Sequence, residues 1–279
     1  MEDGVTPTDT LQFVSSPYPE RMSMIRVNTV KQRLQRGECV FGCVVGPYPY
    51  TAEVVAGAGF DFIQVDGEHY PLTPLILEDV VRAGDSAGVV TFTRLPAFDQ
   101  RIIIPFLDTG VLGLQVAHCT TAADMREVVA ATKYAPIGQR GVSGGRVRAY
   151  GAIPQDQHIA EWNEQMLAMA MLEDKEAMDN LPEMLEVEGL DVIAIGLGDL
   201  SASLGHPGER EHPEVWKAVE TMSRQIRDAG KWVAVASVKN PGRYADIGVQ
   251  IFKESATPML RDRALEVVRA SWESVGRVA

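Results

Sequence analysis

The 279-residue sequence has few cysteines, a deficit of positive charge and no long hydrophobic run. Its three cysteines are an odd number, and Cys39 and Cys43 lie four residues apart in a stretch typical of one strand. Two side chains at that spacing on a strand are too far apart to form a disulfide easily. We therefore expect three reduced thiols, which favours a cytoplasmic protein. A lone cysteine pair without further ligands is a weak signal for zinc.

Other absences exclude whole classes of function. No run approaches the ~18 apolar residues of a membrane span, and the polar segment Met1–Pro19 has no apolar signal core. With 26 Lys and Arg against 38 Asp and Glu, the net charge of −12 argues against nucleic acid or a membrane as a partner. A small anionic substrate stays possible, because a few local cations can override the average charge.

Short apolar runs alternate with amphipathic stretches from residue 27 onward. The runs predict strands at Val40–Val45, Phe60–Val65, Val89–Thr93, Gly113–Ala117, Ala168–Leu172, Val192–Ile195, Trp232–Ala236 and Gln250–Lys253. The stretches predict helices at Val27–Gln35, Thr51–Ala58, Thr73–Ala87, Gln100–Asp108, Ala122–Lys133, Lys175–Glu186, Pro213–Ala229, Pro241–Asp246 and Arg261–Val275.

This alternation predicts an α/β fold, a (β/α)₈ TIM barrel over residues 25–279 that ends in a helix. Residues 1–24, which contain three prolines, are expected to form an irregular arm. A doubly wound open sheet is the rival fold, although no G-x-G-x-x-G follows the first strand. The glycine-rich connection Tyr134–Glu164 carries Arg140, Arg146 and Arg148, and we interpret it as a lid or binding segment or as a solvated loop.

Polar residues follow several expected strands, at the end of the barrel where such folds place their active sites. Glu173 and Asp199 are 26 residues apart, about one βα repeat, so we expect them to project from adjacent strands. A divalent cation would relieve their mutual repulsion, and oxygen ligands favour Mg²⁺ or Mn²⁺, with Co²⁺ also possible. The alternative is that the two carboxylates cap the helices that follow.

The cations and histidines near these strand ends have functional and structural interpretations. Arg94 could bind a carboxylate or enolate oxygen, or form a structural salt bridge. His69, flanked by Asp66 and Glu68, is a candidate base, and His118 is a weaker candidate. The turn Leu197–Asp199 could offer backbone N–H groups to an anion. We expect the remaining histidines at the surface: His158, His206 and His212.

Several segments, in this order, resemble the HpcH/HpaI aldolase family, whose members are metal-dependent pyruvate aldolases of the phosphoenolpyruvate/pyruvate barrel type. The matching segments are Phe62–His69, Thr93–Asp99, Phe106–Gly110, Ala135–Gly141, Met171–Glu173, Glu176–Pro182 and Ile195–Ser201. The resemblance runs from Val27 to Val268. The combination of D-G-E-H with G-x-x-D-L-S is its most specific part.

The resemblance implies roles for individual residues. Glu173 and Asp199 match the metal ligands, and Arg94 matches the residue that holds the C2 oxygen of pyruvate as it becomes an enolate. His69 matches the acid/base group, and Asp108 matches its partner from a neighbouring helix. Gly198 and Asp199, in the turn that begins at Leu197, match the backbone donors for the substrate carboxylate.

The sequence departs from the family pattern at positions that contact substrate. Met171 replaces the usual glutamine, Gly196–Asp199 replaces G-P-A-D, and Glu254–Thr257 replaces a small-residue turn. The expected function is retro-aldol cleavage of a 4-hydroxy-2-oxo acid to pyruvate and an aldehyde. The alternatives are decarboxylation of oxaloacetate with capture of the enolate, as in macrophomate synthase, and a barrel that binds a small acid without turnover.

The final helix has an apolar face that includes Leu265, Val268 and Trp272. This face could pack on its own barrel. The family resemblance instead implies that the helix is exchanged between subunits, in a homo-oligomer such as a trimer or hexamer.

Overall fold

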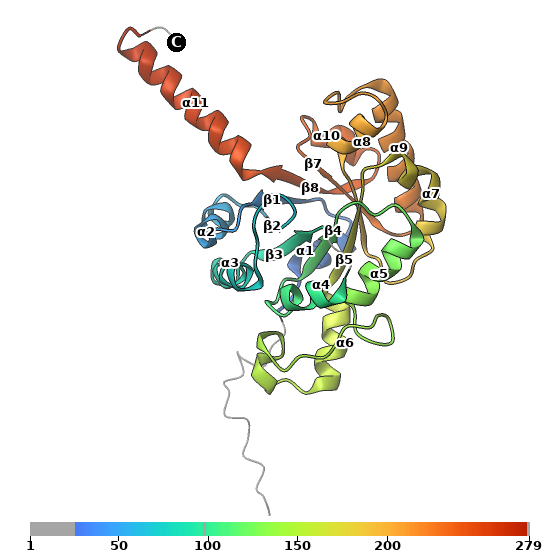
Figure 1. The fold of residues 1–279 in the computed structure, drawn as a ribbon. Helices are drawn as coiled ribbons and strands as arrows, with labels where there is room; N and C mark the ends of the chain where they lie inside the picture. The colour runs from blue at the N-terminus through green and yellow to red at the C-terminus, as the bar shows by residue number, and fades with distance from the viewer. Residues whose placement is uncertain (1–25, 97–98, 278–279) are drawn as a thin grey trace, which may run out of the picture.

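The computed structural model describes residues 26–96 and 99–277, which form a closed barrel of eight parallel strands (Figure 1). The strands pair in chain order, and β8 pairs with β1. They are β1 (Val40–Val45), β2 (Phe62–Asp66), β3 (Val90–Leu95), β4 (Gly113–Val116), β5 (Leu167–Leu172), β6 (Val192–Ile195), β7 (Trp232–Ala236) and β8 (Val249–Ser255). The (β/α)₈ prediction is confirmed and the open sheet is wrong. The predicted arm, residues 1–24, lies outside the described residues.

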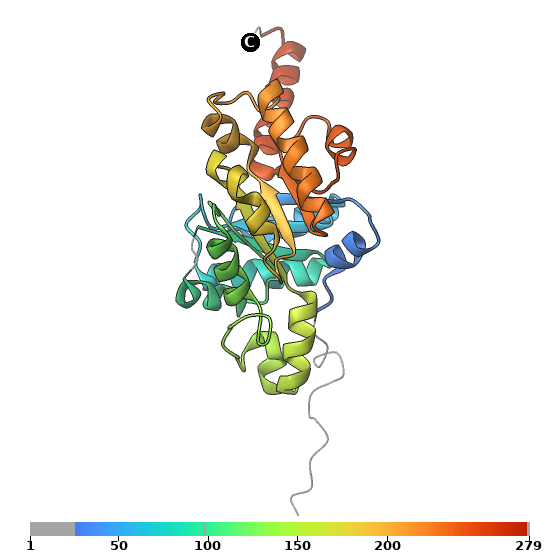
Figure 2. The same cartoon turned by 90° about the vertical axis from the view of Figure 1, so that its right-hand side faces the viewer.

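Helices surround the barrel and connect its strands (Figures 1 and 2). They are α1 (Thr29–Gln35), α2 (Pro49–Gly57), α3 (Pro74–Ala87), α4 (Gln100–Leu107), α5 (Ala122–Thr132), α6 (Gln155–Gln165), α7 (Lys175–Leu185), α8 (Leu197–Ser203), α9 (Pro213–Asp228), α10 (Pro241–Ala245) and α11 (Ala256–Ser274). The sequence did not predict α6 and α8. Within the described residues, no helix is both long enough and apolar enough to cross a membrane, and all three cysteines are free.

Side chains fill the interior and the amino-terminal end of the barrel, which determines where a site can form. Inside the strands, Phe62 and Phe92 pack with their ring centroids 4.8 Å apart. Val30 and Leu34 of α1 join this interior cluster. The Asn28 side chain anchors α1 by donating to the carbonyl of Leu112, just before β4. Because α1 fills the amino-terminal end of the barrel, the carboxyl ends of the strands are left for chemistry.

The connection Tyr134–Glu164 lies at the amino-terminal end of the barrel, so its interpretation as a lid over the strand ends is wrong. It contains most of α6, which leads directly into the start of β5. Arg140 is buried, with its guanidinium 3.8 Å from the ring centre of Trp162. Arg146 pairs with Asp85 at 2.6 Å. These arginines therefore stabilise the fold at the end opposite the predicted site.

Helix α11 projects away from the barrel, and none of its residues is buried (Figure 1). Leu260 is 73% exposed, and Leu265 and Val268 of the apolar face are also exposed. On the outer face of β1 and β8, Phe41 stacks on Phe252 yet stays 44% exposed. The helix therefore does not pack on its own barrel.

His158 is buried, so the prediction that it lies at the surface is wrong. Its Nε2 lies 3.1 Å from the hydroxyl of Tyr134, and its ring packs beside Trp162. Burial, together with the charges of Arg140 and Arg148, lowers the pKa of His158 to about 4. The native protein therefore holds this imidazole in its neutral form.

The buried His158 predicts a loss of stability in mild acid. Between pH ~6.5 and ~4 the unfolded chain protonates this imidazole and the native chain does not, so unfolding becomes more favourable as the pH falls. His158→Gln keeps a polar group beside Tyr134 but does not titrate. We expect the fall in Tm from pH 7 to pH 5 to be smaller in this variant than in the wild type. An equal fall would contradict the prediction.

Candidate active site

A buried ion pair between Asp66 and Arg94 lies at the carboxyl ends of β2 and β3, where the two residues are in register. Arg94 Nε donates to Asp66 Oδ1 at 3.0 Å, and Arg94 Nη2 donates to Oδ2 at 2.7 Å. Burial alone would raise the pKa of Asp66, but the hydrogen bonds and charge of Arg94 outweigh it and lower that pKa. Asp66 is therefore a carboxylate that fixes the direction of the guanidinium.

The turn after β2 supplies a second carboxylate to Arg94. Asp66 Oδ1 accepts the backbone N–H groups of Glu68 and His69, at 3.0 and 3.4 Å, which folds the turn back over the strand end. Glu68 Oε2 then lies 3.0 Å from Arg94 Nη1. The guanidinium is held on two sides by anions, as expected for a cation with a fixed orientation.

Glu173, Glu68 and His118 form a cluster beside this pair, with one ligand atom of each residue within 4.8 Å of the others. His118 donates its backbone N–H to Glu173 Oε1 at 3.0 Å, and its Nδ1 lies 3.1 Å from the same oxygen. His118 Nε2 lies 3.4 Å from Glu68 Oε1. A backbone φ of 54° at His118 places its ring between the two carboxylates, a conformation that is uncommon for a residue other than glycine.

The electrostatics of Glu173 fit a divalent cation. Burial, with the charges of Glu68 and Asp199, raises the pKa of Glu173 to about 7, against the opposing hydrogen bond and charge of His118. A buried carboxylate with two further carboxylates nearby attracts a hard cation that prefers oxygen ligands. Asp199 is close enough to act on Glu173 but is not part of the three-residue cluster, so the predicted ligand pair is only partly assembled.

Gly196, at the end of β6, permits this close approach of strand ends. A Cβ at this position would lie 2.7 Å from both Cβ and Oε2 of Glu173. The absence of a side chain therefore lets the turn that carries Asp199 lie against the buried carboxylate.

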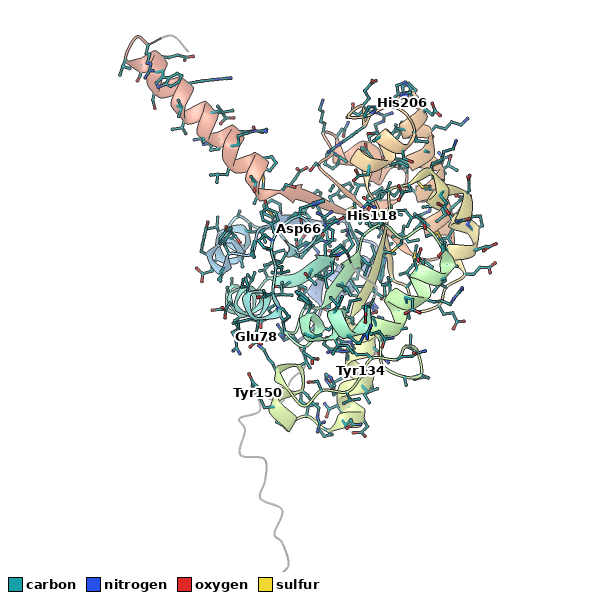
Figure 3. All side chains as sticks on the ribbon, in the orientation of Figure 1. Asp66, Glu78, His118, Tyr134, Tyr150 and His206 are labelled. Atoms are coloured by element: carbon teal, nitrogen blue, oxygen red, sulfur yellow. The ribbon has the colours of Figure 1, made fainter. Side chains whose placement is uncertain are left out.

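Two cavities lie at these strand ends. One, of about 320 Å³, is lined by Asp66, His69 and Arg94. Figure 3 labels Asp66 among the side chains at this end of the barrel. The other, of about 190 Å³, is lined by Leu197–Asp199 and Arg210. The two cavities share four lining residues: Met171, Ala236, Lys253 and Ser255. They therefore adjoin.

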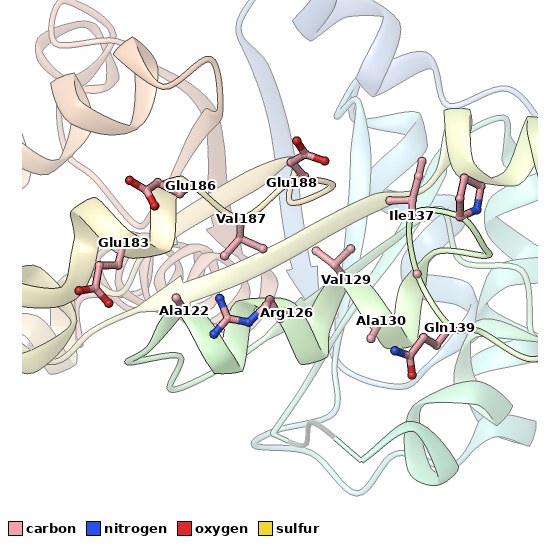
Figure 4. A pocket seen from close by; sticks show the side chains of 12 residues that line it. Ala122, Arg126, Val129, Ala130, Ile137, Gln139, Glu183, Glu186, Val187 and Glu188 are labelled. Atoms are coloured by element: carbon pink, nitrogen blue, oxygen red, sulfur yellow. The ribbon is translucent and has the colours of Figure 1, made fainter.

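A larger hollow, of about 860 Å³, lies on the outside of the barrel beside α5 and α7 (Figure 4). Its charged lining residues are Arg126, Glu183, Glu186 and Glu188. It contains none of the polar residues at the strand ends, so its size does not make it the site of chemistry.

The structure separates the two residues that were expected to form an acid/base pair. His69 lines the 320 Å³ cavity at the strand ends. Its side chain is 67% exposed, and its Nε2 lies 3.8 Å from Glu68 Oε2. Asp108 follows α4 at the amino-terminal end of the barrel, where it accepts a hydrogen bond from Arg140 at 2.6 Å. Within one chain, the expected contact between Asp108 and His69 is therefore wrong.

Sequence reasoning gave too little weight to several residues of the site. Glu68 was treated only as a neighbour of His69, and His118 depends on a backbone angle that no local pattern reveals. Arg210 reaches the smaller cavity from an irregular loop. Lys253 interrupts the apolar run of β8, and that charge could have indicated a buried functional group.

The Asp66–Arg94 pair predicts a stability effect. Asp66→Asn removes the charge but keeps the shape, so the free energy of unfolding should fall by about 1.5–3 kcal/mol, the contribution of hydrogen bonds to charged groups. Urea unfolding measures this change. Glu220→Gln, which breaks an exposed pair with Arg224, is the matched control and should change stability by less than about 0.5 kcal/mol. Equal effects of the two substitutions would contradict the prediction.

Comparison with known proteins identifies relatives along most of the chain. Residues 43–253 match the family model "HpcH/HpaI aldolase/citrate lyase". The chain is 38% identical to 2-keto-3-deoxy-L-rhamnonate aldolase of Escherichia coli over 213 residues, 75% of this chain and 79% of the relative. It is 36% identical to 4-hydroxy-2-oxo-heptane-1,7-dioate aldolase of Shigella sonnei over 252 residues, 87% of this chain and 94% of the relative.

A solved structure extends the likeness to three dimensions. The HpcH/HpaI aldolase of Desulfitobacterium hafniense superposes with a TM-score of 0.83 and 28% identity, covering 88% of this chain and 96% of that one. The chain therefore belongs to the HpcH/HpaI aldolase/citrate lyase family and is a lyase of the aldolase type.

Proposed function

We propose that this lyase cleaves a 4-hydroxy-2-oxo acid to pyruvate and an aldehyde, by way of the enolate of pyruvate. The observation that carries the proposal is the fixed guanidinium of Arg94, which lines the 320 Å³ cavity and lies close enough to the buried carboxylate of Glu173 to feel its charge. An enolate is stabilised by preorganised positive charge at its oxygen. Arg94 supplies one such positive charge, and the carboxylate of Glu173 could hold a metal cation as a second.

We assign Glu173 and Asp199 as ligands of a divalent metal, Mg²⁺, Mn²⁺ or Co²⁺. When bound, such an ion would polarise the C2 carbonyl of the substrate and offset charge that develops on its oxygen. Glu68 and His118 each have a ligand atom within 4.8 Å of one of Glu173. The high pKa of Glu173 supports this assignment, because a carboxylate that is costly to ionise alone gains most from a cation.

In the proposed reaction, Arg94 donates hydrogen bonds to the C2 oxygen, and Asp66 keeps the guanidinium aligned during the charge change. His69 takes the proton of the C4 hydroxyl, directly or through a water. The C3–C4 bond then breaks, its electron pair enters the enolate, and the aldehyde leaves. Proton return to C3 gives pyruvate. Asp108 has no part in this single-chain site.

The substrate carboxylate is assigned to the smaller cavity. There the backbone N–H groups of Gly198 and Asp199, in the turn that begins at Leu197, are the proposed donors. Arg210, which lines the same cavity, adds positive charge. The substrate class that follows is a small 2-oxo acid.

The proposed function predicts metal-dependent release of pyruvate. Against a panel of 4-hydroxy-2-oxo acids and oxaloacetate, EDTA should stop pyruvate formation, and Mg²⁺, Mn²⁺ or Co²⁺ should restore it. Glu173→Gln should weaken metal binding at least tenfold without loss of Tm, since it removes a charge that is costly to bury. Glu183→Gln, in the outer hollow, is the control.

Turnover that persists in EDTA, or unchanged metal affinity of Glu173→Gln, would reject these assignments. Pyruvate from oxaloacetate alone would favour decarboxylation over aldol cleavage as the reaction.

We also propose that the chain forms a homo-oligomer, a trimer or hexamer, in which α11 covers an apolar face of another copy. The exposed apolar residues of α11 and the uncovered Phe41 support this proposal. Leu265→Glu combined with Val268→Glu should give a smaller species in size-exclusion chromatography with light scattering. Arg263→Ala, on the same helix, should leave the mass unchanged. A monomeric wild type would contradict the proposal.

A further inference from the structure

Lys253 is a buried lysine that the proposed reaction does not use. It lies on β8, is 7% exposed and borders both cavities of the site. Its Nζ donates to Gln115 Oε1 at 2.7 Å, the one partner it has among the described residues. Burial and the charge of Arg94 lower the pKa of Lys253 to about 7, against the opposing charges of Asp66 and Glu173.

A second buried lysine shows what a structural role looks like in the same barrel. Lys133, near the amino-terminal end, pairs with Asp191 at 2.9 Å and also donates to the carbonyl oxygens of Asn163 and Met166. Its three N–H groups are used within the protein. Those of Lys253 are not, although the cost of burying an amine is similar at both positions.

Two glutamines beside Lys253 also have unused donors. Gln64 Nε2, on β2, is buried and has no hydrogen-bond partner among the described residues. Gln115 Nε2, on β4, has only the thioether sulfur of Met171, at 3.0 Å, which is a weak acceptor. Gln64 and Gln115 both line the larger cavity with Lys253. Buried polar groups without partners are rare in proteins. The unpaired Gln64 Nε2, together with two donors that are only partly paired, points to a missing acceptor at this cavity.

The position of Lys253 indicates what the acceptor is. Arg94, the proposed partner of the C2 oxygen, lines one cavity, and Gly198 and Asp199, the proposed carboxylate donors, line the other. A 2-oxo acid bound across both cavities would place its carboxylate and carbonyl oxygens near Lys253, which has the one charged side chain among the four lining residues that the cavities share. An amine donates N–H groups to such oxygens in either protonation state.

We propose that Lys253, with Gln64 and Gln115, forms a further oxygen-binding site that holds the carboxylate or enolate oxygens of the 2-oxo acid. The identity of the ligand rests on the proposed function. In this role Lys253 touches the substrate and adds to the stabilisation that Arg94 gives to the enolate.

The experiment measures oxalate binding to the Mn²⁺-loaded protein by calorimetry, because oxalate is planar and carries oxygens like those of the pyruvate enolate. Lys253→Met keeps the length and removes the donor. We expect its affinity for oxalate to fall about 10- to 100-fold, the effect of losing a hydrogen bond to a charged group. Its Tm should stay equal or rise, because an incompletely paired amine is replaced by an apolar group.

Lys133→Met is the matched control and should show the opposite pattern: a lower Tm and unchanged oxalate affinity. Gln64→Leu should fold and bind oxalate several-fold more weakly. These two variants separate a loss of the fold from a loss of the ligand site.

Oxalate affinity of Lys253→Met within twofold of wild type would overturn the inference, as would failure of the wild type to bind oxalate. If Lys253→Met does not fold, unchanged affinity in Gln64→Leu and Lys253→Gln overturns it. Failure of the proposed function is seen separately, as absence of pyruvate release by the wild type in the metal-restoration assay.

Discussion

The ion pair between Asp66 and Arg94 is the interaction on which the rest of the site depends. It lies at adjacent strand ends, where the barrel fixes both backbones, and it determines where the guanidinium points. Its carboxylate also folds the following turn, which brings Glu68 to Arg94 and His69 to the cavity. A single buried carboxylate thus organises a cation, a second anion and a candidate base.

The site balances opposite charges that are each costly to bury. Burial and nearby carboxylates raise the pKa of Glu173, whereas burial and the charge of Arg94 lower the pKa of Lys253. Neither group reaches full compensation within the chain. A metal cation would balance the charge of Glu173, and an acidic substrate would balance that of Lys253. The net charge of −12 does not prevent an acidic substrate from binding, because the cations Arg94 and Lys253 line the cavity. At the opposite end of the barrel, which α1 fills, the ion pairs Arg146–Asp85 and Lys133–Asp191 have a structural role.

The fold could be read from the sequence because continuous apolar runs separated by amphipathic stretches are typical of strands buried on both faces. Helix α6 was missed because its connection is rich in glycine and proline, and α8 because it is short. His158 lies in a polar local sequence, and it is buried between Trp162 of its own helix and Tyr134, which comes from another segment. The metal, enolate and base roles that the motifs imply stay predictions. The location of Asp108 could not be predicted, because a motif does not say at which end of the barrel a residue lies.

The central claim is that this site generates the enolate of pyruvate. Exchange of the methyl protons of pyruvate with deuterated water, followed by NMR, tests it without knowledge of the physiological aldehyde. With Mg²⁺, Mn²⁺ or Co²⁺ the wild type should exchange these protons far faster than buffer does, and EDTA or Arg94→Lys, which loses the fork geometry of the guanidinium, should slow the exchange. Tight binding of pyruvate without exchange, in the presence of any of the three metals, would contradict the account.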